Sequence, residues 1–213
     1  EIDTIVVNSE WTGEVVRNMY NREPDKIIYP STSLGPYSPS YQKSGQNDYY
    51  LYLGSIGTHH RTGEVIRAFN DTKFNLKIAG DGDDIGELKS LSGENIEFVG
   101  FVEGKNKYNL LANAKALVNP TDHSYGRVLV ESLASGTPII SIKAGFAPYL
   151  IEGGYSGLLY EEGSENLKET IRDFEREGVS AITKELVTLT EPYRKQETLN
   201  DWKKLVSDCK YKA

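Results

Sequence analysis

The sequence lacks several features that mark particular classes of protein. Among its 213 residues there is one cysteine, Cys209, which excludes a disulfide within the chain and is typical of a reducing compartment. Apolar runs such as residues 137–142 are short, whereas a bilayer-spanning helix needs about 20 apolar residues. We therefore expect a cytoplasmic protein without a transmembrane segment.

Basic runs are also absent. The formal net charge is −7, and an acidic chain without a cluster of lysine and arginine predicts no nucleic-acid partner. The opening residues, EIDTIVVNSEW, carry no basic segment and do not resemble a signal peptide. Because the chain begins with Glu1 rather than methionine, we expect it to be part of a longer protein.

The chain does contain a regular alternation of strand-like and helical patterns. Runs rich in β-branched and aromatic residues are followed by segments with apolar residues at helical spacing. This alternation predicts an α/β fold, with a Rossmann-like, doubly wound parallel sheet covered by helices on both faces. The predicted strands are 49–54, 75–79, 96–99, 115–119, 137–142 and 157–160. The predicted helices are 63–70, 83–91, 107–114, 127–135, 147–152 and 164–177.

Two further regions flank this alternating core. The opening reads as a strand at 4–8, a helix at about 10–20 and a strand at 26–30, and a stretch rich in Ser, Pro, Gly and Tyr follows at 30–47. The tail reads as one or two helices without a place in the sheet. We therefore divide the chain into an opening part and linker at 1–47, a central domain at 48–180 and C-terminal helices at 181–213.

The predicted sheet locates a site before any motif is considered. In the common strand order 3-2-1-4-5-6, ligands bind where the order reverses, between the first and fourth strands. The loops after these strands carry all three histidines, His59, His60 and His123. These histidines could ligate a metal together with Asp122, contact a phosphate, or be solvated residues without a role. Nothing has the spacing of a zinc motif, so we expect no metal.

The segment SYGRVLVESL follows the fourth strand. A helix is predicted to begin near Gly126 or Arg127, and its unpaired first N–H groups suit a phosphate. Glu131 lies one turn further on and could accept hydrogen bonds from ribose hydroxyls. An alternative stays open, because Arg127 and Glu131 are also spaced for an ordinary ion pair on the helix surface.

Two glycine-containing loops complete the predicted crevice. In AGDGDDIGEL, Gly80 and Gly82 predict a tight turn that precedes a helix. Asp83 or Asp84 would cap the N-terminus of this helix. We interpret this loop as mainly structural, with a contact to base or ribose left open. It lacks the G-x-G-x-x-G fingerprint, which argues against a dinucleotide-dependent dehydrogenase. In KAGFAPYLIEGG, the loop at Gly145 leads into another helix that could contact a phosphate or sugar.

The order of these motifs resembles the C-terminal half of a GT-B-fold glycosyltransferase of the large retaining family 4, or group 1. The similarity covers residues 49–177 and extends back to residue 4. It is carried by YLYLGS, LKIAGDG, NIEFVGFVEG, NAKALVNP, HSYGRVLVESLASGTPII, AGFAPYLIEGG and SGLLY. The resemblance implies a donor domain that binds a nucleoside-diphosphate sugar, for transfer of a hexose-like sugar to a glycan, lipid or other acceptor. It implies no metal and no other cofactor.

The resemblance also implies a missing partner. The opening part is similar to the last βαβ piece of the family's N-terminal, acceptor-binding domain, and residues 190–213 would cross back to it. Catalysis in the family takes place between the two halves, so this chain alone is expected to be inactive. Contact with the inner face of a membrane would depend on the missing half.

The resemblance assigns roles to individual residues. Glu131 corresponds to the glutamate that holds the donor ribose, and Tyr125-Gly126 corresponds to a Phe-Gly step that precedes the phosphate-facing helix. The backbone at Phe101 and Val102 would contact the base, and Gly145 would belong to a flexible loop. The implied donor-binding residues are Ser55, His60, Gly80, Gly82, Phe101, Val102, Tyr125, Gly126, Arg127, Glu131 and Gly145.

Three positions depart from the family pattern. His123 replaces a glutamate that faces the donor sugar, Ser55 replaces an arginine, and His60, followed by Arg61, replaces a lysine. In the family these cations stabilise the departing diphosphate, which is often the largest contribution to catalysis. The candidate catalytic residues are His123, Asp122 and Arg61.

Two hypotheses remain open on these residues. The chain is either the donor domain of an active transferase with a divergent site, or a non-catalytic homologue that binds or regulates a partner. A related epimerase or phosphorylase is a variant of the first hypothesis.

Overall fold

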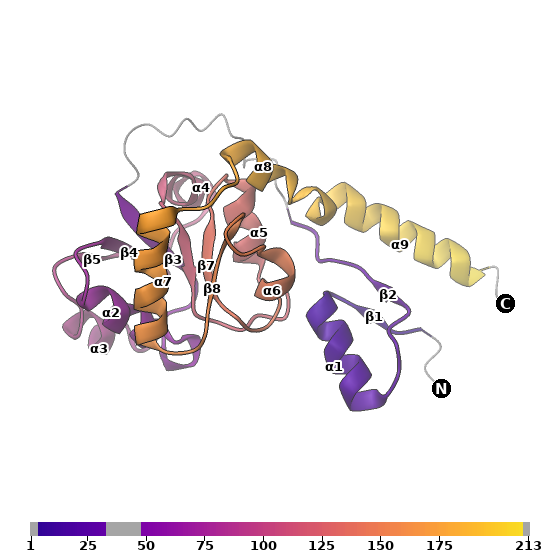
Figure 1. The fold of residues 1–213 in the computed structure, drawn as a ribbon. Helices are drawn as coiled ribbons and strands as arrows, with labels where there is room; N and C mark the ends of the chain where they lie inside the picture. Colours follow the sequence, from indigo (N-terminus) through magenta and orange to yellow (C-terminus); the bar gives the residue numbers. More distant parts are fainter. Residues whose placement is uncertain (1–3, 33–47, 211–213) are drawn as a thin grey trace.

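The fold was analysed in a computed structural model, in which residues 4–32 and 48–210 are described. A six-stranded parallel sheet forms its centre, in the order β5-β4-β3-β6-β7-β8 (Figure 1). Numbered along the chain within this sheet, the order is 3-2-1-4-5-6, and the predicted doubly wound fold is confirmed. The strands are β3 (Tyr49–Leu53), β4 (Asn75–Ala79), β5 (Ile96–Gly100), β6 (Leu117–Asn119), β7 (Ile139–Ile142) and β8 (Gly157–Tyr160).

Helices cover both faces of the sheet and create one apolar layer on each. Along β3, Tyr50 and Tyr52 point to one layer while Tyr49 and Leu51 point to the other, as alternation along a strand requires. The helices of the first layer are α2 (Thr62–Asn70), α3 (Ile85–Ser90) and α7 (Ser164–Glu177). The helices of the second layer are α4 (Gly104–Asn113), α5 (Arg127–Ala134), α6 (Ala147–Leu150) and α8 (Thr183–Thr188).

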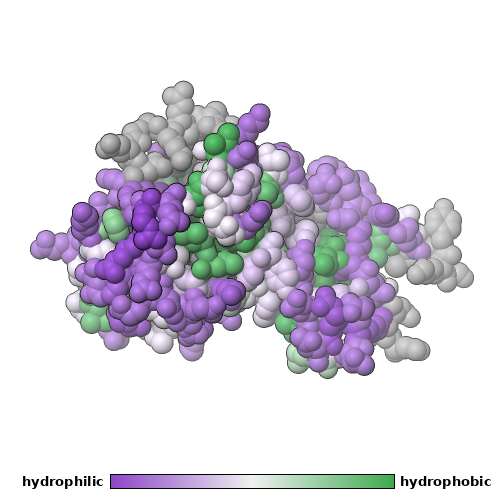
Figure 2. Space-filling model, viewed as in Figure 1, coloured by the Kyte–Doolittle hydropathy of each residue, from purple (hydrophilic) through white to green (hydrophobic). Residues whose placement is uncertain are grey.

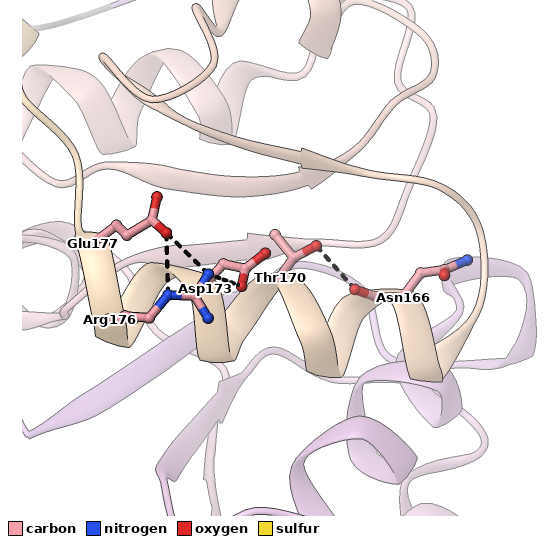
Figure 3. Close-up of polar contacts among 5 residues, drawn as sticks. All are labelled: Asn166, Thr170, Asp173, Arg176 and Glu177. Atoms are coloured by element: carbon pink, nitrogen blue, oxygen red, sulfur yellow. Dashed lines mark hydrogen bonds and ion pairs between the residues drawn. The ribbon is translucent and has the colours of Figure 1, made fainter.

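Helix α7 shows how an outer helix is held. Leu167 and Ile171 are fully buried against the sheet. Near the end of the helix, Arg176 contacts Asp173 at 2.8 Å and Glu177 at 2.9 Å (Figure 3). The surface over α2 and α7 is mostly hydrophilic (Figure 2). Exposed ion pairs of this kind contribute about 1 kcal/mol or less, so the apolar face anchors the helix.

Residues 4–32, which we name the opening unit, form a small βαβ structure beside the main sheet. Strands β1 (Val6–Val7) and β2 (Lys26–Ile27) pair in parallel, and α1 (Glu10–Tyr20) connects them. The C-terminal helix α9 (Lys195–Lys210) follows the short 3₁₀ helix η2 (Glu191–Tyr193) and extends along the opening unit (Figure 1). Lys26 Nζ lies 2.9 Å from Asp201 Oδ1, and the Thr198 hydroxyl donates to the Tyr29 carbonyl at 3.0 Å. Within the described ranges, no helix is both long and apolar enough to cross a membrane.

Several predicted boundaries differ from the structure. The strand predicted from residue 137 begins at Ile139, because Pro138 has no N–H and the Thr137 hydroxyl donates to the Leu111 carbonyl at 2.6 Å. Residues Thr58–His60 form a 3₁₀ helix, η1, where only a loop was expected. Most of the predicted linker, residues 33–47, lies outside the described residues.

Candidate functional site

A crevice lies beyond the carboxyl ends of β3 and β6, where the strand order reverses. It contains two adjoining pockets. The first, of about 340 Å³, includes His60 and His123 in its lining, and we name it the histidine pocket. The second, of about 620 Å³, includes Glu131 in its lining, and we name it the glutamate pocket. Five residues line both pockets: Leu53, Gly54, Ser55, Arg127 and Val128.

The start of α5 forms the boundary between the two pockets. Gly126 precedes the helix with φ +64°, and no side chain caps the helix N-terminus. A Cβ at this glycine would lie 2.9 Å from Leu129 Cδ1, so only glycine fits the turn without strain. The unpaired N–H groups and the helix dipole create a local environment that favours an anion. The predicted start of this helix near Gly126 or Arg127 is confirmed, and it lies at the crevice.

Arg127 and Glu131 do not form the ion pair that was left open as an alternative. Arg127 is exposed and lines both pockets. Glu131 is buried, and its Oε1 accepts from Lys107 Nζ at 2.8 Å. Lys107 belongs to α4, and sequence reasoning missed it because only the fold brings α4 beside α5. Its position one turn into the helix after β5 was the available signal.

The loops after β3 and β6 contact each other. The Thr121 hydroxyl donates to the His60 carbonyl at 3.3 Å, and His60 and His123 both line the histidine pocket. Burial lowers the pKa of His123, nearby His60 lowers it further, and Asp122 opposes the shift. His59 does not line the histidine pocket. It lines a neighbouring surface pocket, which shares Ser55 and His60 with the histidine pocket, so the three histidines do not all face one pocket. Nowhere in the described ranges do three His, Cys, Asp or Glu side chains lie close enough to hold a metal ion.

Two of the three candidate catalytic residues lie away from both pockets. Asp122 is exposed and lines neither pocket. Arg61 takes a left-handed conformation, with φ +53°, at the start of α2, and its guanidinium contacts Glu162 at 2.9 Å. The turn directs its side chain toward the end of β8 rather than into the crevice. Of the predicted catalytic residues, the structure brings only His123 to the site.

Gly80 and Gly82 hold the loop after β4 against the loop after β3. A Cβ at either position would lie 1.8 Å from a carbonyl oxygen, that of Gly54 or of Ile56. Gly80 lines the glutamate pocket, whereas Gly82 lines the neighbouring surface pocket beside His59.

The predicted capping role of Asp83 or Asp84 is wrong. Asp84 occupies the position before α3, but its carboxylate does not cap the helix. It accepts instead from the Thr58 N–H at 2.8 Å and from the Thr58 hydroxyl at 3.0 Å, and these bonds lower the pKa of Asp84. The acid therefore fixes the loop after β3 rather than the start of α3.

The remaining predicted binding residues divide into pocket-lining and supporting positions. Phe101 is 73% exposed and lines the glutamate pocket. Val102 lines neither pocket and packs against the apolar layer of α4 and α5. Gly145, with φ +62°, packs closely against the loop that carries His123. A Cβ at this position would lie 2.5 Å from the His123 carbonyl oxygen, so the close approach requires glycine.

Asn119 was not identified from the sequence, although it contributes to the floor of the histidine pocket. It is buried at the end of β6, and its Nδ2 donates to the Thr121 carbonyl at 2.8 Å and to the Ser141 hydroxyl at 2.9 Å. These bonds fix the loop that carries His123. A polar residue at the carboxyl end of a buried strand was the signal that could have found it.

Comparisons with known proteins agree with this architecture. The family described as "Glycosyl transferases group 1" matches residues 37–189. An uncharacterized glycosyltransferase of Methanocaldococcus jannaschii is 29% identical over 133 residues, which cover 60% of this chain and 38% of the relative. Sucrose-phosphate synthase of Thermosynechococcus elongatus has a similar fold, with a TM-score of 0.85 and 16% identity, covering 100% of this chain and 60% of that one. HepE of Anabaena, solved in complex with UDP, gives a TM-score of 0.78 with 17% identity, covering 96% of this chain and 64% of that one.

The chain spans less than two thirds of the length of each of these proteins. The solved structures establish the likeness of fold, and the family match covers most of the sequence. The chain belongs to the glycosyltransferase group 1 family.

Proposed function

We propose that this chain is the donor-binding part of a glycosyltransferase, and that its crevice holds the diphosphate of a nucleoside-diphosphate sugar. The observation that carries the proposal is the uncapped start of α5, which lies at the crevice beside Arg127. The lining of the histidine pocket, within the described residues, includes His60, His123 and Arg127 but no carboxylate. The Arg127 guanidinium and the helix N-terminus attract an anion.

The glutamate pocket offers a place for the nucleoside. Glu131 presents a carboxylate for the ribose hydroxyls, and the exposed ring of Phe101 borders the same space. The pocket adjoins the α5 start, so a nucleotide would place its ribose in the glutamate pocket and its phosphates beside Gly126. HepE of Anabaena, which has this fold, is described in complex with UDP, which supports a nucleotide ligand here.

The proposed reaction is transfer of a hexose, with retention of configuration, to a glycan, lipid or other acceptor. The acceptor would be held by a part of the protein outside this chain, because the relatives are longer than the chain. The isolated chain is therefore expected to bind the donor without turning it over. Arg127 and the α5 N-terminus supply the positive potential for the diphosphate, so no metal is required.

Thermal unfolding with nucleotides tests the proposal. UDP, GDP and ADP would each be added at millimolar concentration, and at least one should raise the melting temperature, because a ligand that binds the folded state stabilises it by mass action. Arg127→Ala should reduce the shift, whereas Lys105→Ala, an exposed lysine on α4 outside both pockets, should not. Melting temperatures that stay unchanged with all three nucleotides would contradict the proposal.

The second candidate function is a non-catalytic homologue that binds or regulates a partner. It is favoured by the departures in the histidine pocket, where Ser55 carries no charge and the pKa of His123 is lowered. Arg61 does not compensate, because it contacts Glu162. Calorimetry separates the two functions. A donor site binds nucleoside-diphosphate sugars as well as nucleoside diphosphates, whereas binding of the diphosphates alone would favour the second.

A further inference from the structure

The contact between Lys107 and Glu131 joins two helices at the glutamate pocket. The Glu131 side chain is 9% exposed and that of Lys107 is 23% exposed, and their charged atoms lie 2.8 Å apart. Both residues line the pocket, one from α4 and one from α5. Glu131 Oε2 accepts no hydrogen bond from any described residue. Lys107 thus holds one carboxylate oxygen of a residue that lines the pocket, and the other oxygen has no partner among the described residues.

This arrangement determines what Glu131 can do. Removing a carboxylate from water is costly unless a counter-charge compensates, and Lys107 supplies that charge. An ionised carboxylate only accepts hydrogen bonds, whereas a protonated one also donates. A lysine ammonium is a compact point charge, unlike the two-pronged guanidinium of arginine, and here it engages a single carboxylate oxygen. Lys107 therefore fixes the direction of the Glu131 carboxylate through Oε1 while leaving Oε2 for a ligand.

We propose that Lys107 is a positioning residue that makes this crevice selective for ribose over 2′-deoxyribose. The inference rests on the proposed function, in which Glu131 accepts hydrogen bonds from the two ribose hydroxyls. A deoxyribose offers one hydroxyl where the oriented carboxylate can accept from two. Without Lys107, the Glu131 carboxylate loses its orientation and its counter-charge, and the advantage of the second hydroxyl declines.

The helices themselves do not depend on this ion pair. Leu111 of α4 and Leu129 and Leu133 of α5 are fully buried in one shared apolar layer. The Thr137 hydroxyl also binds the Leu111 carbonyl at the end of α4. Loss of the lysine charge is therefore expected to change the direction and charge of Glu131 while α4 stays in place.

The test compares the dissociation constants of a nucleoside diphosphate and its 2′-deoxy form, measured by calorimetry on the whole chain. The base would be the one, among UDP, GDP and ADP, that binds most tightly. The unmodified chain should favour the ribonucleotide about tenfold or more, the loss typical of one hydrogen bond to a charged group. Lys107→Met should reduce this ratio to about threefold or less. Lys107→Arg should also reduce it, because the two-pronged guanidinium can occupy both carboxylate oxygens. Lys105→Met, on the exposed face of the same helix, should leave it unchanged.

The double variant Lys107→Met with Glu131→Gln removes both charges and provides a second measurement if the single variant does not fold. Its ratio should also be low, since a neutral amide replaces the charged acceptor. The inference is overturned if Lys107→Met or the double variant keeps the full preference, or if the unmodified chain binds both nucleotides equally. If no nucleotide binds at all, the proposed function fails together with the inference.

Discussion

His123 and Glu131 line neighbouring pockets but have opposite electrostatic surroundings. Lys107 lies 2.8 Å from Glu131 and provides a counter-charge for the buried carboxylate of the glutamate pocket. Among the described residues, none provides such a counter-charge at contact distance from His123, and burial together with His60 lowers its pKa. Near neutral pH the imidazole is therefore mainly uncharged. Of the histidine pocket's lining residues, Arg127 then carries the permanent positive charge, and protonation of His123 adds to it only in acid.

The first prediction concerns the pH dependence of nucleotide binding. If the protonated His123 contacts the diphosphate, affinity is highest in acid and falls as the pH rises and the imidazole loses its proton. Because the pKa of free His123 lies below 6.5, the fall begins below pH 6.5 rather than at it. Without a ligand the sign is opposite, since a depressed histidine pKa means that folding stability is lost as the pH falls below 6.5. Calorimetric titrations between pH 5 and 8 measure the binding effect.

The matched comparison uses two of the histidines, His123 and His59. His123→Gln should flatten the pH profile, and the ratio of its affinity to that of the unmodified chain cancels titration of the nucleotide itself. His59→Gln should keep the original profile, because His59 does not line the histidine pocket. An unchanged profile in His123→Gln would remove this residue from the diphosphate site.

At the residue level, the sequence allowed several lining residues of the crevice to be predicted, but it did not allow their ion-pair partners to be predicted. Glu131 and Gly126 were placed correctly because each is fixed by its own helix. The partners of Arg61 and Glu131 could not be predicted, because Glu162 and Lys107 are distant in sequence and meet them only in the folded chain. The direction of a long side chain depends on neighbouring elements, and local spacing does not report it.

Helix α5 requires a glycine in a left-handed conformation immediately before its first turn. Its first turn depends on Gly126 at φ +64°, which sets the direction of the N–H groups at the crevice. Gly126→Ala should destabilise the fold by about 1–2 kcal/mol, because a Cβ is strained in this conformation. The added atom would also press on Leu129 at 2.9 Å, so the helix start should shift and nucleotide affinity should fall.

Chemical denaturation and calorimetry measure the two effects of Gly126→Ala. Gly86→Ala is the control, because Gly86 lies inside α3 and a Cβ there would meet nothing within 4 Å. That substitution should stabilise the chain by about 0.5–1 kcal/mol, since alanine is the better helix former. An unchanged stability and affinity in Gly126→Ala would show that the left-handed turn is not required.

For the main sheet, both the type of each element and the order of the strands could be predicted from the sequence. Alternating strand and helix patterns determined the parallel sheet, and its strand order followed from the connections that parallel strands require. The short elements were missed or misjudged, as with η1 and with α6, which ends at Leu150. Few hydrogen bonds hold such elements, so tertiary contacts decide where they begin and end.

Over the whole molecule, the opening unit and the crevice are joined by an aromatic cluster. The rings of Tyr29, Tyr125, Phe146 and Tyr193 lie with centroids 4.7 to 6.3 Å apart. Tyr125 belongs to the histidine pocket, and its hydroxyl lies 3.1 Å from the Thr32 hydroxyl of the opening unit. The loop before α5 is therefore held from two sides, by the sheet and by the opening unit.

A further contact joins the same regions. The Ser9 hydroxyl, at the N-terminus of α1, donates to the Ser124 carbonyl of the loop that carries His123. Three apolar residues of α9, namely Leu199, Trp202 and Val206, are exposed. The opening unit thus depends on a few specific contacts with the main sheet rather than on a large shared core.

Tyr193→Ala tests this dependence on the whole chain. Tyr193 is buried and its ring packs at 4.7 Å on Tyr29, so its removal should destabilise the docked opening unit by about 3 kcal/mol, as for other large aromatic residues. Hydrogen–deuterium exchange should quicken in residues 4–32 and in the loop 121–126, while β3 and β4 stay protected. Tyr20→Ala, which removes an exposed tyrosine of α1, should leave exchange unchanged. Equal protection of residues 4–32 in both variants would show that the aromatic cluster does not hold the opening unit.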